Sequence, residues 1–167
     1  NTQNAFDAIR QRMHAGHAFE PRIDIQLSPN LIVISDNGIG MSPDDLTRHY
    51  WTAGNSSKNN EAARAAGVVG TFGIGAMANF GIADTLTVET ESAITGQRTV
   101  CRAEKARLSL KEDCIERQII PAIGRCGTTI TAHVAPDSHI NVRQARNYIA
   151  EFVSLVDIPV YVDNDLV

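Results

Sequence analysis

The sequence Asp-Asn-Gly-Ile-Gly-Met occupies residues 36–41 and follows directly after the hydrophobic run Leu-Ile-Val-Ile at residues 31–34. Such a run predicts a buried strand, so the Asp36 carboxylate comes at a strand end, at the edge of a pocket. There it can accept a hydrogen bond from an exocyclic amine such as adenine N6. Gly38 and Gly40 lack a Cβ atom, which lets the backbone approach a flat ring. The stretch therefore predicts a pocket that recognises a ring with an amino group.

Three further motifs contain residue types that suit phosphate or a metal ion. Asn-Ala-Phe-Asp-Ala at residues 4–8 lies on a predicted opening helix, Gly-Thr-Phe-Gly-Ile-Gly at 70–75 precedes a predicted helix, and Gly-Thr-Thr at 127–129 opens a predicted strand. A glycine-rich turn before a helix presents free N–H groups and the positive end of the helix dipole, which favour phosphate. The amide oxygen of Asn4 is a hard ligand of the kind that magnesium accepts.

Each motif alone is a weak signal, because Asp-x-Gly-x-Gly is also a common turn. The run Gly-Ile-Gly-Ala-Met-Ala at residues 73–78 even fits the dinucleotide-binding pattern G-x-G-x-x-A. That pattern requires a clear strand before it and a parallel βαβ unit around it. Here the preceding Ala-Ala-Gly-Val-Val at 65–69 is a poor strand and the following strands are predicted to be antiparallel. A dinucleotide-binding site is therefore disfavoured.

Hydrophobic periodicity predicts helices and strands in separate blocks. The opening helix has Ala5, Ile9 and Met13 on an apolar face and ends near Gly16, and a second helix begins at Ser42 with Pro43 and two Asp residues in its first turn. Locally paired strands with segregated helices predict an α+β fold, a two-layer α/β sandwich with a mostly antiparallel sheet. The remaining predicted strands lie near residues 23–27, 31–34, 86–88, 99–101, 129–134 and 160–162. A helix is predicted after residue 75, and a last helix over about 142–156 has Ala145, Ile149, Phe152 and Val156 on one face.

Composition predicts one domain over residues 1–167 and excludes some classes of function. The formal charge of −4 argues against a surface that binds nucleic acid throughout, and no apolar run approaches the roughly 20 residues that cross a membrane. Three widely spaced cysteines fit neither a zinc site nor a complete disulfide framework, which predicts a cytoplasmic protein.

The four motifs in this order resemble the N box, the G1 box, the G2 box and the late Gly-Thr of the GHKL superfamily of ATPases. The resemblance covers essentially the whole chain and is closest to the N-terminal domain of Hsp90 and HtpG-type chaperones. Residues 4–8 resemble N-A-x-D-A, residues 36–41 resemble D-x-G-I-G-M, and residues 70–75 resemble G-x-F-G-x-G. The stretch from Phe152 to Val160 is similar to the segment that closes the Hsp90 nucleotide domain.

This resemblance implies a Bergerat fold that binds ATP or ADP with Mg²⁺ between helices and an antiparallel sheet. Asp36 is then expected to bind the adenine amine with support from Thr128, and Asn4 to bind the metal. Residues from about 51 to 69 are expected to form a lid. The remaining expected nucleotide contacts are Ala8, Gly40 and Met41 around the ring, and Gly70, Phe72, Gly73 and Gly75 near the phosphates.

The chain also departs from the family pattern. The general base of the family is a Glu four residues before the N-box Asn, a position before Asn1, so no catalytic residue is assigned. The lid lysine expected near Gly54 or Asn55 is absent, with Lys58 as a displaced candidate, and Gln11 stands where a basic residue is common. The sequence thus supports nucleotide binding better than hydrolysis.

Several functions remain open. The leading hypothesis is the ATPase domain of an Hsp90-like chaperone, a part of a longer protein that forms a homodimer and acts on client proteins. The alternatives are the ATPase module of a DNA-processing protein like MutL or a type II topoisomerase, a histidine-kinase-type catalytic domain, and a non-catalytic nucleotide sensor. No membrane and no nucleic acid are expected as partners of the leading candidate.

Overall fold

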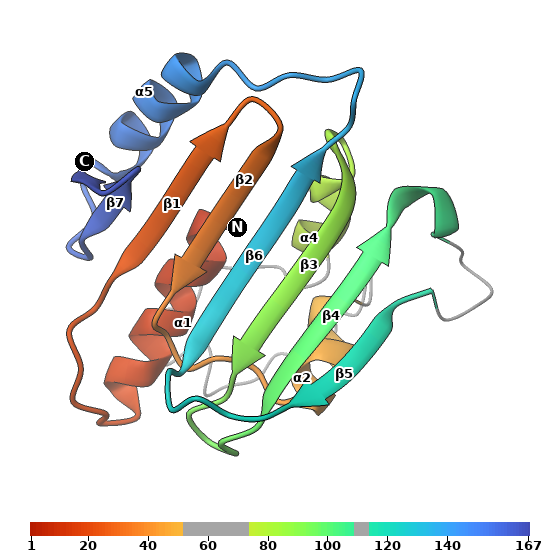
Figure 1. Ribbon diagram of the computed structural model, residues 1–167. Coiled ribbons are helices and arrows are strands. Elements are labelled where there is room, and N and C mark those ends of the chain that lie inside the picture. Colours follow the sequence, from red (N-terminus) through yellow and green to blue (C-terminus); the bar gives the residue numbers. More distant parts are fainter. Residues whose placement is uncertain (52–73, 109–113) are drawn as a thin grey trace.

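An eight-stranded sheet organises the described part of the chain (Figure 1). The computed structural model describes residues 1–51, 74–108 and 114–167. Within these ranges the strand order is β5-β4-β3-β6-β2-β1-β7-β8. The strands are β1 (Ile23–Ser28), β2 (Leu31–Asp36), β3 (Ala83–Glu91), β4 (Arg98–Glu104), β5 (Glu116–Ile120), β6 (Gly127–Val134), β7 (Val160–Val162) and β8 (Asp165–Leu166).

Neighbouring strands are antiparallel at every pairing except β1 with β7, which is parallel. The predicted hairpin is confirmed, since β1 and β2 pair from Ile23 opposite Asp36 to Ser28 opposite Leu31. The long strand β6 enters between β2 and β3 and brings Thr128 directly opposite Asp36. The mostly antiparallel sheet of the sequence prediction is therefore confirmed.

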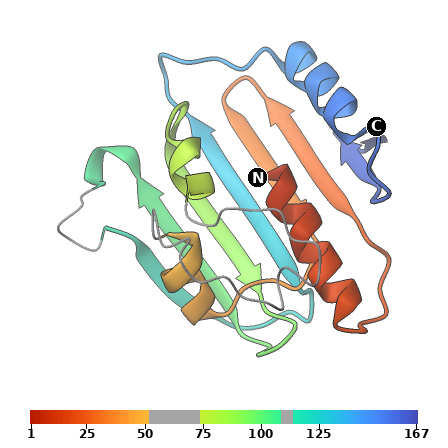
Figure 2. The ribbon, with the colours of Figure 1, turned by 180° about the vertical axis from the view of Figure 1, so that it is seen from behind.

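Helices cover one face of this sheet, as the view from behind shows (Figure 2). They are α1 (Thr2–His14), α2 (Pro43–Asp45), which continues into the π-helical turn η1 (Leu46–Tyr50), and α4 (Ile74–Asn79). Another helix, α5 (Val142–Val153), packs near β1 and β7, and a 3₁₀ turn, η2 (Lys105–Arg107), follows β4. None of the described helices is long and apolar enough to cross a membrane.

Two hydrophobic clusters join the helices to the sheet. In the first, Phe6 and Ile9 of α1 pack with Ile23 of β1, Val153 of α5 and Val160 of β7. The second cluster places η1 and α4 over β3, β4 and β6, and its largest members are Leu46, Tyr50, Trp51, Phe80, Leu86, Val88 and Ile130. Fully burying a side chain of this size contributes about 1.5–3 kcal/mol each. The two layers predicted from the sequence are thus present.

The predicted start of the second helix is confirmed in detail. The Ser42 hydroxyl accepts a hydrogen bond from the Asp45 amide at 3.1 Å, and the Asp45 carboxylate accepts one from the Ser42 amide at 3.0 Å. Pro43 occupies the first turn, where its missing N–H has no partner to lose. This reciprocal cap fixes the direction in which the chain leaves the turn after β2.

The prediction for the last helix is wrong at its end. The helix stops at Val153 rather than near Val156, and Phe152, predicted to share a face with Ile149 and Val156, is 48% exposed. Val153 is buried in its place, because the face that packs on the sheet carries Ile149 and Val153 at a spacing of four. Met13, assigned to the apolar face of α1, is likewise 52% exposed.

Two edge strands were not predicted. In β5 the first four residues are all exposed, and β8 consists of Asp165 and Leu166 alone, both exposed. Neither segment alternates between polar and apolar residues, because neither covers a core. β5 and β8 are strands because they pair with β4 and β7, respectively. The local sequence does not predict such pairing.

Candidate functional site

A cleft of about 70 Å³ between α1 and the sheet collects residues from three of the four motifs. Six of the ten predicted site residues line it: Asn4, Ala8, Asp36, Gly40, Met41 and Thr128. The other lining residues are Asn1, Ala5, Asp7, Gln11, Ile34, Ile39, Tyr50 and Ile130. The polar face of α1 thus forms one wall, and the ends of β2 and β6 form the floor.

Asp36 ends β2 with its side chain only partly exposed. Its Oδ1 accepts a hydrogen bond of 2.8 Å from the backbone N–H of Gly38. Burial raises the pKa of Asp36 to about 7, although hydrogen bonds from the backbone N–H groups of Gly38 and Thr128 favour its ionised form. The carboxyl group is therefore poised to change charge near neutral pH.

Thr128 stands opposite Asp36 on β6 and is 7% exposed. Its hydroxyl oxygen lies 2.9 Å from that of Thr90, the partner residue on β3. The Thr90 hydroxyl also accepts a hydrogen bond of 2.9 Å from the Met41 amide and donates one of 3.0 Å to the Gly127 carbonyl. Thr90 has one proton and the carbonyl can only accept, so all contacts are satisfied together when Thr128 donates to Thr90. The Thr128 oxygen then remains an acceptor toward the cleft.

The glycine turn after β2 rests against α1 and β3. The Ile39 amide donates to the Ala8 carbonyl at 3.0 Å, and a Cβ at Gly38 would lie 2.6 Å from the Ala8 carbonyl carbon. Gly40 has a φ of +66°, and a Cβ there would lie 2.0 Å from the Glu91 carbonyl oxygen. The predicted reason for these glycines was room for a flat ring. In the structure, the packing of the turn against the protein itself already requires them.

Asn4 projects from α1 at the edge of the same cleft and is partly exposed. Its side-chain amide forms no hydrogen bond with any residue that the structure describes. The described residues also contain no group of three His, Cys, Asp or Glu side chains that could hold a metal ion. A cation here would accordingly take Asn4 as one hard ligand and complete its shell with oxygens of a bound ligand and water, which fits the chemistry of Mg²⁺.

The glycine-rich motif lies mostly beyond the described ranges. Three of its predicted contacts, Gly70, Phe72 and Gly73, lie outside the described residues. So does the predicted lid at about 51–69, with Lys58, except for Trp51. Gly75 is the second residue of α4. The end of that helix contacts the start of α1, because the Asn1 side-chain amide donates to the Asn79 amide oxygen at 2.5 Å.

Two buried polar residues of the cleft were not predicted as site residues. Asp7 is 2% exposed, lines the cleft and accepts a hydrogen bond of 3.1 Å from Gln3. It belongs to the motif at residues 4–8 but was not selected from it as a site residue. Its spacing of three from Asn4 was the available signal. Tyr50 is 4% exposed and also lines the cleft. It directly precedes the predicted lid, and no motif indicated that it would line the cleft.

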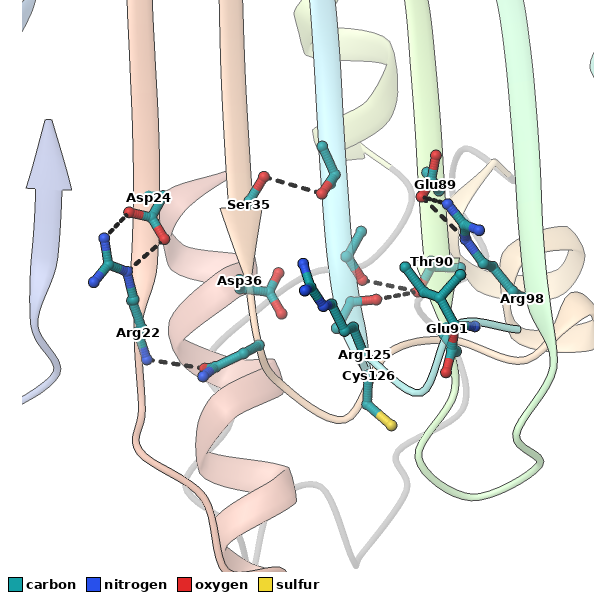
Figure 3. A pocket seen from close by; sticks show the side chains of 15 residues that line it. Arg22, Asp24, Ser35, Asp36, Glu89, Thr90, Glu91, Arg98, Arg125 and Cys126 are labelled. Atoms are coloured by element: carbon teal, nitrogen blue, oxygen red, sulfur yellow. Dashed lines mark hydrogen bonds and ion pairs between the residues drawn. The ribbon is translucent and has the colours of Figure 1, made fainter. Parts of the chain in front are cut away.

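A larger hollow of about 370 Å³ lies on the opposite face of the sheet (Figure 3). Its charged side chains come largely in pairs: Arg22 binds Asp24 at 2.6 Å, and Arg98 binds Glu89. Ser35 and Thr129 likewise bind one another at 2.9 Å. Asp36 and Thr128 line this hollow as well as the smaller cleft. The smaller cleft adds the side-chain amide of Asn4, which has no hydrogen bond to any described residue, and it is therefore the better candidate site.

The sequence of this chain matches a known protein family over most of its length. Residues 2–124 match the model of the family described as histidine kinase-, DNA gyrase B-, and HSP90-like ATPase. The chain belongs to this family. The GHKL resemblance predicted from the four motifs is thereby confirmed.

Among curated proteins the chain is similar to bacterial chaperone proteins HtpG. It is 24% identical to that of Campylobacter jejuni over 88% of the chain and 24% of the relative's length. It is 26% identical to that of Orientia tsutsugamushi, over 96% of the chain and 27% of the relative, and 27% identical to that of Rhodopseudomonas palustris, over 96% and 28%. The chain thus spans about a quarter of the length of these relatives.

Proposed function

We propose that this chain binds adenine nucleotides and that Asp36 and Thr128 together recognise the amino group of the base. One observation carries the proposal: these two residues are cross-strand partners, and both line the cleft beneath α1. An ionised Asp36 and a Thr128 hydroxyl engaged by Thr90 are both acceptors. The exocyclic amine of adenine has two N–H donors for them, whereas guanine has a carbonyl oxygen at that position.

The other predicted contacts extend this arrangement. Ala8, Gly40 and Met41 lie beside the two acceptors and would pack against the ring. Because the cleft of about 70 Å³ is smaller than the roughly 300 Å³ of ordinary ligand pockets, the ribose and phosphates would extend beyond it. We assign their recognition to the backbone of Gly70, Phe72, Gly73 and Gly75, with Asn4 as the protein ligand of a magnesium ion.

The wider role that we propose is the ATPase domain of an Hsp90-like chaperone, with residues 1–167 as one nucleotide-binding domain of a longer cytoplasmic protein. HtpG relatives that align over 88% to 96% of the chain support this choice. Dimerisation and action on client proteins belong to the same proposal. A DNA-processing ATPase and a histidine-kinase-type domain are the alternatives, since the family includes both kinds.

Calorimetric titration of this chain with ATP and with GTP, each with and without Mg²⁺, tests the proposal. We expect saturable binding of ATP that Mg²⁺ strengthens, and binding of GTP that is weaker by on the order of tenfold to a hundredfold. Equal affinity for both nucleotides would contradict recognition of the amino group. Absence of binding by either would contradict the function as a whole.

Two variants separate the pocket from the fold. Asp36→Asn replaces an ionisable acceptor inside the cleft, and we expect ATP binding to be lost while the thermal unfolding transition remains cooperative. Asp24→Asn is the matched control, because Asp24 lies on the opposite face of the sheet in an exposed ion pair with Arg22. Its ATP affinity should equal that of the wild type.

A further inference from the structure

Arg12 is a charged residue in the last turn of α1 that the proposed function leaves unused. Its Nη1 donates a hydrogen bond of 2.7 Å to the backbone carbonyl of Asn37, the residue directly after Asp36. One helical turn earlier, the Ala8 carbonyl accepts a hydrogen bond of 3.0 Å from the Ile39 amide. Ala8 and Arg12 are four residues apart and lie on one face of the helix. The helix therefore holds the turn after β2 at two points.

The Asn37 carbonyl and the Gly38 N–H belong to one peptide unit, which is planar and has these two groups pointing in opposite directions. At one end the carbonyl accepts from Arg12, and at the other the N–H donates to Oδ1 of Asp36 at 2.8 Å. A charge-assisted hydrogen bond to the carbonyl fixes the plane and polarises it, which makes the N–H a stronger donor. Arg12 thus acts on the Asp36 carboxylate through a single rigid unit.

Both partners of this hydrogen bond are held by other contacts. The Arg12 guanidinium carbon lies 4.3 Å from the centroid of the Phe19 ring, and partly buried Phe19 packs against the hydrophobic cluster beneath α1. The Asn37 side chain accepts from the Arg22 amide at 2.9 Å and donates to the Glu20 carbonyl at 2.6 Å. The contact between Arg12 and Asn37 therefore joins groups that are already ordered, so that little further conformational entropy is lost in forming it.

The contact also bears on the charge of Asp36. Burial raises the pKa of Asp36 to about 7, and the hydrogen bond from the Gly38 N–H acts against that rise. A weaker Gly38 donor would leave less of the ionised carboxylate at neutral pH and would hold it less firmly. Both changes would weaken the acceptor for the adenine amine without altering the contacts of the ribose and the phosphates.

We infer that Arg12 is a positioning residue for recognition of the base, which holds the Asn37–Gly38 peptide unit so that this unit orients the Asp36 carboxylate toward the adenine amine. The inference rests on the proposed function and deepens it. Arg12 is not among the residues that line the cleft, so its effect on a bound base passes through Asp36.

Arg12→Met tests this, because it removes the donor and keeps a side chain of similar length. Two probes separate positioning from a general structural role: ADP, and the diphosphate of purine riboside, which differs from ADP only by the lack of the amino group. We expect the affinity of the variant for ADP to fall about fivefold to tenfold and that for the analogue to change less than about twofold, by calorimetry with Mg²⁺. Arg12→Lys, whose ammonium group can donate to the same carbonyl, should bind ADP within about threefold of the wild type.

Arg102→Met is the matched control, since Arg102 is 53% exposed on β4 in an ion pair with Glu104, and both affinities should be unchanged. Unfolding transitions show that each variant is folded, and Arg12→Gln takes the place of Arg12→Met with the same two probes if the latter does not fold.

An unchanged affinity of the Arg12 variant for ADP, with a wild type that prefers ADP to the analogue, would overturn this inference alone. Equal losses for ADP and the analogue would overturn it too, since they would show that Arg12 only supports the fold. A wild type that binds both probes equally would instead overturn the proposed recognition of the amino group, and this inference with it.

Discussion

Thr90 and Thr128 place their hydroxyl oxygens 2.9 Å apart across β3 and β6, and this contact connects the glycine turn to the floor of the cleft. Both residues are buried, and the Thr90 hydroxyl also accepts a hydrogen bond from the Met41 amide. The position of the turn, the direction of the Thr128 proton and the start of β6 at Gly127 therefore depend on one side chain. Thr90 contacts no ligand in this arrangement, and its role is to position the residues that do.

Replacing Thr90 by Val should destabilise the ligand-free chain by about 1–3 kcal/mol, because the partly buried Met41 amide and the buried Gly127 carbonyl lose a shared partner. Urea unfolding measures this change. Thr87→Val is the control, since Thr87 lies on the same strand but is only partly buried, and its effect should remain within about 0.5 kcal/mol. Equal effects of the two substitutions would show that the Thr90 network adds nothing to stability.

Asp36 should make stability depend on pH in a direction that is unusual for a carboxylate. Its pKa is raised from 3.8 to about 7 in the folded chain, so the folded state holds a proton that the unfolded state has released. The stability that this group contributes is present below about pH 4 and is lost as the pH rises toward 7. Wild-type stability should therefore fall relative to that of Asp36→Asn between pH 4 and 8. Thermal unfolding across this range measures it, and parallel profiles for the two proteins would refute the raised pKa.

Gly40 and Gly96 form a matched pair for testing how tightly the glycine turn packs. Their φ angles are +66° and +68°, but a Cβ at Gly40 would lie 2.0 Å from the Glu91 carbonyl oxygen, whereas nothing lies within 4 Å of one at Gly96. Gly96→Ala should cost about 1–2 kcal/mol for the left-handed backbone alone. Gly40→Ala should cost about 2–5 kcal/mol, because the clash is added to that strain. Denaturant unfolding compares them, and a similar loss for both would mean that the turn can move away from β3.

The sequence predicted those parts of the fold and the site that depend on local patterns. The strand before Asp36, the cap at Ser42 and the polar face of α1 are all recorded in the spacing of nearby residues. The pairing of Asp36 with Thr128 could be predicted only from family resemblance, because 92 positions separate them in the chain, from 36 to 128.

Other features depended on contacts that local sequence does not contain. The strand β5 exists because it pairs with β4. Tyr50, at the end of η1, lines the cleft together with Met41 and Ile130, which are distant from it in the sequence. Phe152 shows that a local pattern can also mislead, because a large apolar residue at a helical spacing need not face the core. Gly40 lines the cleft as predicted from its motif, but the atom that excludes its Cβ belongs to β3, which the local sequence does not indicate.

Asn4 gives the last prediction, which separates metal binding from nucleotide binding. Its amide lines the cleft and is free of hydrogen bonds to the described residues, which fits a ligand of Mg²⁺. Asn4→Ala should weaken the binding of Mg·ATP on the order of tenfold and that of metal-free ADP less than twofold, since only the first complex would use the amide oxygen. Calorimetry with Mg²⁺ present or chelated gives both values on one protein, so the metal-free arm controls for any change in the cleft. Equal losses in the two arms would assign Asn4 to the nucleotide itself, because a group that contacts only the metal cannot affect binding when the metal is absent.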